Sequence, residues 1–576
     1  MRIKTTKTKN SEIFYVIKST YIDKKHSTKI VEKLGNINEV KAKANGEDPY
    51  VWAKEYAKKL TMQEKEGTRK IIKEYSQSRI IPKDEQRLFN GGYLFLQKIY
   101  YDLKIDKICD DITNKYQFKF DLNQILSYLV YSRIIFPSSK LKTLEESKKF
   151  IEQPTFEYQH MIRALEKICL ECDFIQSELY KYSNQYKPRN NQILYYDLTN
   201  FFFEIEQEDD LRKYGVSKEH RPNPITQFGL FMDGNGIPLA CETNPGNTNE
   251  NITLKPLEKK IIKDFELSKI VVCTDAGLAS KANRKFNNLS TRAFITTQSI
   301  KQLKQDLKDW VFDTKGWKSN VISNKTLDIS SLFTNDELAN KYKDTTFYKE
   351  RWIKDDEGFE QRLIVTFSIK YKRYQENIRQ AQINRAIKLI NSNPKKISKP
   401  KQNDFKRFID ITNYTDDGQI ADNNYYSINQ DIINEEAKYD GYYAVCTNLE
   451  DDANEIVKIN HHRWEIEESF RIMKSEFKTR PVYLSREDRI KAHFLTCFIA
   501  LTIFRYLEKK LDEQYTYSEI IDTLQNMNFL KEDNDYIPMY KRTDITDSLH
   551  NKFGFRTDYE IITEKNIKKI CKQSKN

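Results

Sequence analysis

The sequence predicts an α/β protein in which a mixed sheet follows a mainly helical region. Between residues 191 and 300, short apolar runs typical of strands occur in the order strand, hairpin, helix, strand, helix, strand. Strands that alternate with helices in this way are typical of a mixed α/β sheet. From residue 47 to 190, by contrast, apolar residues recur at the three- and four-residue steps of buried helices. These two patterns set the fold class.

The first region, residues 1–46, is predicted to be a β-hairpin region. Two runs rich in β-branched and aromatic residues, EIFYVIKSTY and TKIVEKLG, flank the polar residues DKKH. Two such runs around a polar turn are typical of a hairpin. Residues 47–190 follow as the helical region, with turns at Ile81-Pro82, Gly91-Gly92 and residues 136–139.

The first part of the sheet is predicted over residues 191–300. The apolar run Ile193–Tyr196 is followed by a carboxylate, Asp197, and the strand 270–273 stops just before Asp275. Between them, Asp233-Gly234-Asn235-Gly236 joins two apolar runs and predicts a tight hairpin turn.

Residues 301–440 break this rhythm and are predicted to be an insertion domain. Its segment 370–407 holds twelve Lys or Arg residues against two acidic ones. The sheet pattern returns in 441–511, where a strand is followed by helices, and 512–576 is predicted to be a C-terminal helical region.

Composition excludes a membrane protein and a disordered chain. The 576 residues are 39% apolar, 31% charged and 12% aromatic, and the longest apolar run, 493–507, is too short to span a bilayer. Lys and Arg exceed Asp and Glu by 96 to 84, a modest excess that favours polyanions and equally suits ordinary solubility. The eight cysteines are scattered through apolar runs, as in a reducing compartment, so a cytoplasmic location is expected.

Asp197 and Asp275 are the first candidate functional residues. Each follows an apolar strand, and ligands bind near the carboxyl ends of strands in open sheets. Oxygen ligands on neighbouring strands suit Mg²⁺ or Mn²⁺. Taken singly, each aspartate is better explained as a helix N-cap or a turn acceptor.

The third candidate element is a helix predicted over residues 460–474. At 100° per residue, Arg463, Glu467 and Lys474 fall on one stripe. A solvated face with favourable i,i+4 pairs has the same pattern. Apolar residues such as Trp464 and Ile466 surround much of the helix, however, and charges on a packed helix need partners, which metal ions and phosphates supply.

The spacing R-x3-E-x6-K of Arg463, Glu467 and Lys474 resembles the Y-R-E-K signature of bacterial insertion-sequence transposases of the DDE type. Residues 132–140, SRIIFPSSK, are also similar to a segment of that family. The other segments that carry the resemblance are YYDLTNFFFE at 195–204, GLFMDGNGIPLACETNPGNTNEN at 229–251, VVCTDAGLAS at 271–280 and RPVYLSREDRIKAHFLTCFIALTIFRYLE at 480–508.

The resemblance implies an RNase H-like mixed-sheet catalytic core interrupted by an insertion domain. Asp197, Asp275 and Glu467 would be both the catalytic residues and the ligands of two Mg²⁺ ions, for which Mn²⁺ can substitute. The implied reaction is metal-dependent DNA cleavage at the element ends, followed by strand transfer of the 3′-OH into target DNA. The implied partners are double-stranded DNA, as terminal inverted repeats and target, and a second copy of the chain in a paired-end complex.

Several residues are candidates for DNA contact. Arg463 and Lys474 would hold phosphates of the transferred end, and Asn460 stands where the signature has tyrosine, so it could bond a phosphate but not stack. The helical region 81–190 is a candidate for end recognition, with a helix-turn-helix around 122–148, although plain helical packing fits equally. Four basic residues of the insertion are further candidates against a solvated helix: Lys372, Arg373, Arg379 and Arg385.

Three alternatives to an active transposase remain. The chain could be a catalytically inactive, transposase-derived DNA-binding protein, which the Asn460 substitution allows and the intact Asp197, Asp275 and Glu467 oppose. It could be an RNase H-like nuclease that cuts without joining strands. A small-molecule metal hydrolase is a more distant alternative, because the basic insertion and the Arg/Lys stripe speak against it.

Overall fold

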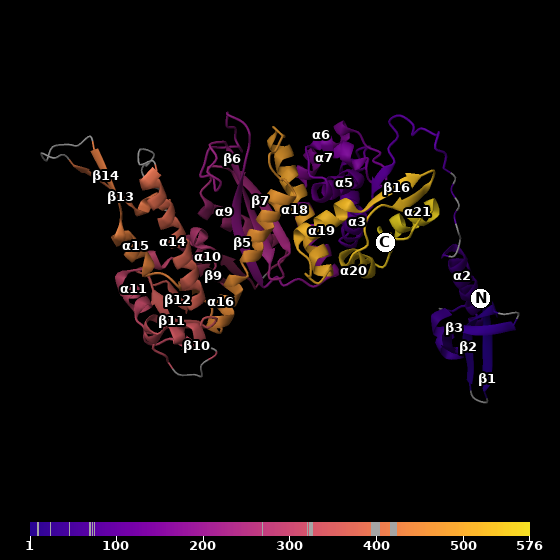
Figure 1. Cartoon of the computed structure of the whole chain (residues 1–576), viewed down its shortest axis with the longest axis horizontal. Coiled ribbons are helices and arrows are strands. Elements are labelled where there is room, and N and C mark those ends of the chain that lie inside the picture. The colour runs from indigo at the N-terminus through magenta and orange to yellow at the C-terminus, as the bar shows by residue number, and fades with distance from the viewer. Residues whose placement is uncertain are drawn as a thin grey trace. The chain divides into compact units, whose positions relative to one another are not determined.

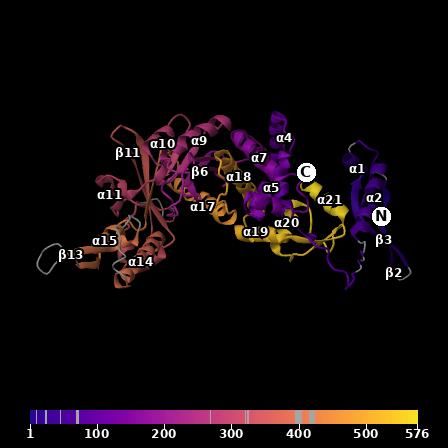
Figure 2. The ribbon, with the colours of Figure 1, turned by 90° about the horizontal axis from the view of Figure 1, so that it is seen from above.

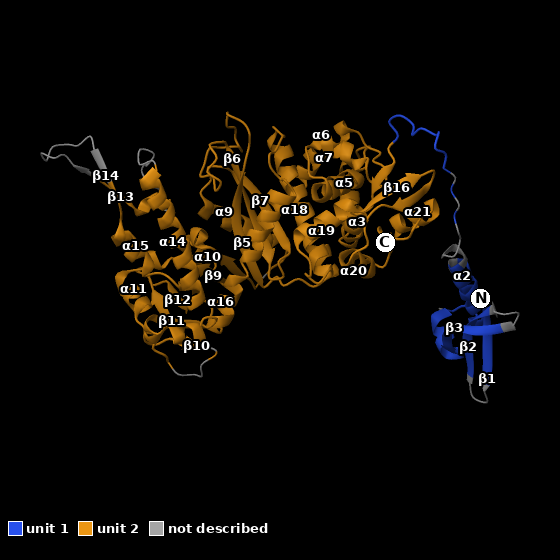
Figure 3. Ribbon diagram, viewed as in Figure 1, with its two compact units in different colours: residues 1–85 blue, residues 86–576 orange. Residues whose placement is uncertain are grey.

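The computed structural model of the chain forms two compact units, Met1–Glu85 and Gln86–Asn576 (Figure 3). It describes residues 1–576 except 9–10, 23–24, 45, 68–70, 72, 74, 268, 320, 322–325, 393–403 and 415–422. Figure 1 labels the elements used below.

The first unit is a three-stranded antiparallel sheet covered by helices. The two runs predicted as a hairpin form its strands β2 and β3, and β1 pairs with the other edge of β2. Phe14, Val16 and Val40 are fully buried between the sheet and the helices. The elements are β1 (Arg2–Thr8), β2 (Ser11–Ile22), β3 (Lys25–Asn36), α1 (Ile37–Ala44) and α2 (Pro49–Gly67).

The second unit is organised around a nine-stranded mixed sheet with the order β10-β11-β12-β15-β9-β8-β5-β6-β7. The central pairs β5–β8 and β8–β9 are parallel, and every other pair in this sheet is antiparallel. The strands are β5 (Ile193–Phe202), β6 (Ile225–Asp233), β7 (Pro238–Pro245), β8 (Val271–Thr274), β9 (Ala293–Thr297), β10 (Lys318–Ser319), β11 (Thr346–Lys354), β12 (Glu360–Ser368) and β15 (Tyr442–Thr447).

The residues predicted as an insertion, 301–440, contribute part of this sheet. Strand β12 pairs with β15, and β11 and β10 extend the sheet beyond it. The rest of the segment is mostly helical and carries a separate two-stranded sheet (Figure 2). Its other elements are α11 (Gln305–Phe312), α12 (Ser331–Thr334), α13 (Asp336–Lys341), α14 (Ile369–Ser392), β13 (Ile409–Tyr414), β14 (Asn423–Ile428) and α15 (Gln430–Ala437).

Helices before and after the sheet share one hydrophobic core with it. Helix α18 (Glu487–Lys510) lies between β7 and the helices α3, α5 and α7 and contacts all four (Figure 1). It is the one helix within the described ranges that is long and apolar enough to cross a membrane, and 94% of its apolar window is buried in the protein. The earlier helices are α3 (Tyr93–Asp102), α4 (Ile105–Tyr116), α5 (Leu122–Ile135), α6 (Lys140–Ser147), α7 (Tyr158–Leu170) and α8 (Cys172–Tyr186).

The C-terminal part of the chain closes onto the beginning of the second unit. Strand β4 (Leu88–Asn90) joins β16 (Asn528–Glu532) and β17 (Asp535–Pro538) in one sheet. Gln97 of α3 donates to the Ser574 hydroxyl at 2.9 Å. The remaining helices of the unit are α9 (Glu250–Asp264), α10 (Lys281–Phe286), α16 (Ala453–His461), α17 (Trp464–Arg471), α19 (Tyr517–Asn526), α20 (Asp544–Phe553) and α21 (Glu564–Gln573).

Candidate active site

Asp197 and Asp275 occupy matching positions on two adjacent strands. Strands β5 and β8 are parallel, and Tyr195 is in register with Cys273. Each aspartate follows its register partner by two residues, and side chains two residues apart on a strand share a face. The register ends at the pair Tyr195 and Cys273, and β8 ends at Thr274, so Asp275 lies just beyond its strand, near enough for its charge to raise the pKa of Asp197. Asp275 also caps the short 3-10 turn Ala276–Leu278, accepting from Leu278 N at 3.0 Å, so it serves the turn as well.

The two aspartates influence each other electrostatically. Burial raises the pKa of Asp197 to about 6, and the negative charge of Asp275 adds to the rise. The cations Lys218 and Arg463 oppose it. Lys218 donates through Nζ to the backbone oxygen of Leu198, the residue after Asp197, at 2.5 Å. This end of the sheet thus holds two carboxylates with basic groups around them.

The prediction of a single helix over residues 460–474 is wrong, because the helical geometry of the chain changes twice within this segment. Helix α16 ends at His461, and i to i−3 hydrogen bonds tighten the turn before α17, among them Glu465 N to His462 O at 3.1 Å. After α17, the segment Ile472–Glu476 is a π-helix, closed by Phe477 N bonding to Ile472 O. Both changes rotate the later residues, so a stripe drawn at 100° per residue does not hold across them.

Of the three predicted stripe residues, Arg463 and Lys474 lie near the aspartates. Arg463 donates to the Thr297 hydroxyl of β9 at 3.1 Å and lowers the pKa of Asp197. Burial lowers the pKa of Lys474 to about 8, the nearby Lys218 lowers it further, and Asp197 opposes both.

Glu467 is solvent-exposed on α17, which packs against β5. Among the described residues, no hydrogen bond or ion pair joins Glu467 to Asp197 or Asp275. The structure therefore brings the two aspartates, Arg463 and Lys474 into one electrostatic neighbourhood. Glu467 lies on α17, the helix that packs against the strand of Asp197.

A buried arginine on α18 holds helix α17 in place through hydrogen bonds. Arg505 of α18 donates to the Glu468 carboxylate at 3.0 Å, to the Ser469 hydroxyl at 2.9 Å and to the Glu465 backbone oxygen at 3.2 Å. It also pairs with Glu508 on its own helix at 2.9 Å. These bonds hold the helix that carries Glu467 against the core.

Asn460 is buried inside the protein. Its side chain is 2% exposed, its amide donates to the Tyr443 hydroxyl at 2.6 Å, and its oxygen accepts from Cys273 Sγ at 3.5 Å. Tyr443 in turn lies 2.8 Å from the Thr297 hydroxyl, to which Arg463 also donates. In this arrangement Asn460 is engaged by protein groups, and the chain of polar contacts leads from it to Arg463.

The predicted basic residues on α14 differ in their surroundings. Arg379 makes a two-pronged ion pair with Asp440, Lys372 pairs with Glu376, and Arg373 donates to an asparagine at 2.6 Å. Arg385 is exposed. The lysine-rich residues 395–401 lie outside the described residues.

Three charged residues near the aspartates escaped the sequence analysis. They are Lys218, Glu219 and Arg480. Glu219 pairs with both Lys474, at 3.3 Å, and Arg480. Lys218 and Glu219 lie in a loop with no periodic pattern, and only their charge could have marked them.

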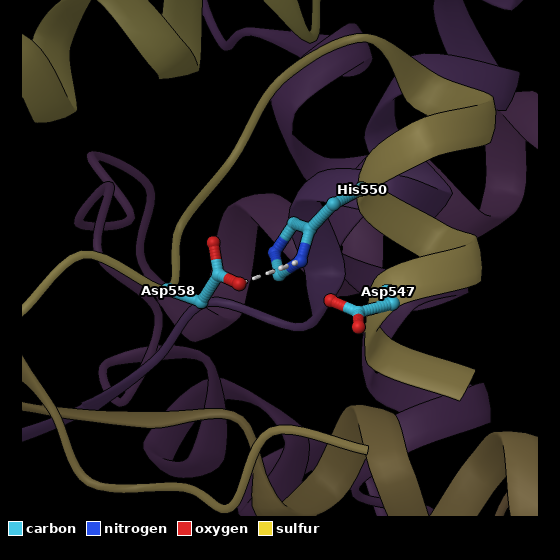
Figure 4. A group of neighbouring side chains, drawn as sticks. All are labelled: Asp547, His550 and Asp558. Carbon is cyan, nitrogen blue, oxygen red and sulfur yellow. Dashed lines mark ion pairs between the residues drawn. The ribbon is translucent and has the colours of Figure 1, made fainter. Parts of the chain in front are cut away.

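Outside this site, one cluster of acidic and histidine side chains has its ligand atoms close enough together to hold a metal ion. Within the described part of the chain, Asp547, His550 and Asp558 are the one group whose ligand atoms all lie within 4.8 Å of one another (Figure 4). Arg556 binds both carboxylates, and Thr557 N donates to His550 Nε2 at 3.2 Å. Arg542 also pairs with both carboxylates, so two arginines balance the two aspartates and these residues form a structural ion-pair network.

Comparisons with known proteins show which residues of the chain resemble a known family. Residues 355–503 match the family model described as a transposase DDE domain. The matched range contains Arg463, Glu467 and Lys474, whereas Asp197 and Asp275 precede it. No curated protein matches the chain.

Two solved transposase structures share remote similarity with the chain. One is the cryo-EM structure of the piggyBac transposase synaptic complex with hairpin DNA, at 8% identity over 75% of this chain and 79% of that chain, with a TM-score of 0.36. The other is the Mos1 transposase paired-end complex with left transposon end, at 9% identity over 43% and 69%, with a TM-score of 0.13. These TM-scores do not establish a shared fold. By the family model, the chain carries a region similar to the DDE domains of transposases.

Proposed function

We propose that the chain is a DDE transposase of a bacterial insertion sequence, which cleaves DNA at the element ends and joins the 3′-OH to target DNA. The observation that carries the proposal is the pair Asp197 and Asp275 at equivalent positions of adjacent parallel strands. The transposase family match over 355–503, which includes Glu467, supports it. The sheet order β7-β6-β5-β8-β9, with Asp197 on the first of these strands in the chain and Asp275 after the fourth, supports an RNase H-like core.

Divalent metal ions fit the two aspartates. Burial raises the pKa of Asp197, and the charge of Asp275 adds to the rise; a cation bound at these carboxylates would stabilise their charged forms. Oxygen donors of this kind suit Mg²⁺, with Mn²⁺ as a substitute. Asp197, Asp275 and Glu467 would hold two ions, and the chemistry that these ions would supply is activation of the attacking oxygen and stabilisation of the leaving oxygen of the phosphodiester.

The other residues of the site would bind and orient the DNA. Arg463 presents a planar guanidinium suited to two phosphate oxygens, and Lys474 supplies a point charge. Thr297 holds the Arg463 side chain in place, and Glu219 does the same for Lys474. In the first step water would attack the phosphodiester, releasing the 3′-OH of the element end and leaving the phosphate on the 5′ end of the flanking DNA. In the second, this hydroxyl would attack a target phosphodiester, forming the new bond and releasing a 3′-OH on the target strand.

The proposed partners are the terminal inverted repeats, the target DNA and a second copy of the chain that pairs the two ends. Arg385 of α14 presents an exposed basic side chain suited to phosphate contact. The free state of all eight cysteines is consistent with action in the cytoplasm, at the bacterial nucleoid.

The test is a cleavage and strand-transfer assay on a labelled element end with Mg²⁺ or Mn²⁺. Wild type should yield a 3′-OH and join it to target DNA, and Asp275→Asn and Glu467→Gln should each lose both steps. Glu455→Gln is the matched control, because Glu455 is an exposed carboxylate on the neighbouring helix α16 that pairs with Lys458.

Each contrary outcome points to a different function. Cutting that survives Glu467→Gln would refute the three-carboxylate site. Cutting without joining would indicate a nuclease, and specific binding without cutting under either metal would indicate a DNA-binding relative.

A further inference from the structure

A basic pocket lies beside the candidate active site, built from two segments that are distant in the sequence. It has a volume of about 610 Å³ and is bounded by the turn between α5 and α6 and by residues 478–484. Part of it is SRIIFPSSK at 132–140, a sequence to which the proposed catalysis assigns no role. Six basic side chains line the pocket: Arg133, Lys140, Lys142, Lys478, Arg480 and His493.

The most informative of these residues is Lys140, the first residue of α6. It is 5% exposed, and its ammonium group has no hydrogen-bond partner among the described residues. Burial, together with the charge of the adjacent Arg133, lowers its pKa to about 7. A buried ammonium without an acceptor is costly, and an anion in the pocket would supply the missing partner.

The groups around Lys140 are nearly all basic or neutral. Arg133 of α5 is 4% exposed, and its Nη groups donate to backbone oxygens. Its Nε has no hydrogen-bond partner among the described residues. On α18, Cys497 opposes the lowering of the Lys140 pKa, and His493 donates to Thr479 O at 3.0 Å. Burial keeps the pKa of His493 well below its usual value, so this ring is neutral.

The residues lining the pocket include no carboxylate. Two of the lining cations already have acidic partners outside the lining: Lys142 pairs with Glu145 and Glu146, and Arg480 pairs with Glu219. No such pair involves Arg133, Lys140 or Lys478 among the described residues. The N-terminus of α6, capped by Ser139, borders the same pocket. The first N–H groups of a helix have no intrahelical acceptor, and they favour anions.

We propose that this pocket binds a phosphate group, and that in the working protein a phosphodiester of the DNA backbone supplies it. Several cationic groups together with a helix N-terminus suit a tetrahedral, multiply charged oxyanion. The choice of DNA rests on the proposed function and on position. Arg480 borders the pocket and shares Glu219 with Lys474, whose ammonium lies near Asp197, so one strand can reach both places. Tyr158 and Tyr483, which are 39% and 70% exposed, offer aromatic surface at the same pocket.

The first measurement uses the full chain and inorganic phosphate, without DNA or metal. The melting temperature of wild type should rise with phosphate concentration at constant ionic strength, relative to chloride. Lys140→Met should abolish this rise. The variant is expected to fold, because it removes a buried charge that has no partner. An equal response of wild type to phosphate and chloride would overturn the proposal.

The matched control is Lys349→Met. Lys349 is also a buried lysine, 3% exposed, but its ammonium donates to two backbone oxygens, those of Trp310 and Asp313. This variant should lose stability and keep the phosphate response. Loss of the phosphate response in both variants would mean that the response follows general stability, and it would overturn the assignment to Lys140.

The second measurement is binding of duplex DNA that contains the element end, followed by fluorescence anisotropy as a function of salt. Lys140→Met should weaken binding about tenfold and reduce the salt slope by about one, the effects expected for one charge-assisted phosphate contact. Unchanged DNA affinity beside a lost phosphate response would refute DNA as the source and indicate a free phosphate ligand. If wild type bound no DNA, the proposed function would fail, while the phosphate measurement would still decide the pocket.

Discussion

Arg505→Met tests the argument that a buried arginine holds the helix carrying Glu467. Arg505 is 8% exposed and donates to two carboxylates, those of Glu468 and Glu508. Glu508 is also 8% exposed, so the substitution would leave it charged, buried and without its cation. Breaking one partner of a buried ion pair costs about 3–5 kcal/mol, and that is the expected loss in the free energy of unfolding.

The measurement is urea denaturation at pH 8 and at pH 5. Burial raises the pKa of Glu508, and Arg505 opposes the rise. Without Arg505 the pKa of Glu508 rises further, so its carboxyl is protonated at low pH and the loss should shrink as the pH falls. In the double variant Arg505→Met with Glu508→Leu, both buried charges are gone, and much of the stability should return.

Arg489→Met is the control for Arg505→Met. Arg489 pairs with Glu166, but both side chains are more exposed, at 26% and 32%, so its loss should cost less than about 1 kcal/mol. Equal losses for the two arginines would refute the reasoning. So would a double variant that is no more stable than Arg505→Met.

Three further predictions follow from single contacts. Between pH 6 and 9 the charge of sulfate is constant, but Lys140 must take up a proton to bind it above pH 7. Sulfate should therefore bind up to about tenfold more weakly for each pH unit above 7. Calorimetry over this pH range measures the affinity, and an affinity that does not change with pH would contradict the prediction. Asn460→Tyr should lower the free energy of unfolding by about 1–3 kcal/mol, because the site is buried and bonds Tyr443; unchanged stability in urea would refute this. Gly236→Ala should cost about 1–2 kcal/mol on the same scale, because Gly236 has φ of 72° and a Cβ there would collide with Glu465; a neutral effect would contradict it.

The pairing of the two aspartates could be predicted from the sequence because a local pattern carries it. An apolar run that ends in a carboxylate marks the end of a buried strand, and parallel strands place such ends together. Asp197 and Asp275 satisfy both conditions. The hairpin at Asp233–Gly236 was predictable for the same reason, since its turn chemistry is local.

Other features depend on contacts that no local pattern carries. The break before α17 follows from packing on two sides, where Asn460 bonds Tyr443 on the sheet while Ile466 faces the core. Helical periodicity assumes an unbroken helix, so it cannot register this turn. The basic pocket is likewise invisible locally, because Lys140 and Arg480 are hundreds of residues apart and nothing in the sequence marks Lys140 as buried.

The sheet formed by β4, β16 and β17 has a consequence for the order in which the chain can mature during synthesis. Asn90 donates to Leu524 O at 2.8 Å, and Gln97 donates to the Ser574 hydroxyl, so the first elements of the second unit are completed by residues that are synthesised much later. Translation at about 5–20 residues per second separates them by on the order of 25–100 s. Until then, α3 and its neighbours lack part of the surface that buries them. A growing chain therefore carries an exposed apolar face until these later residues emerge, and the helical region acquires its native stability only once they have packed against it.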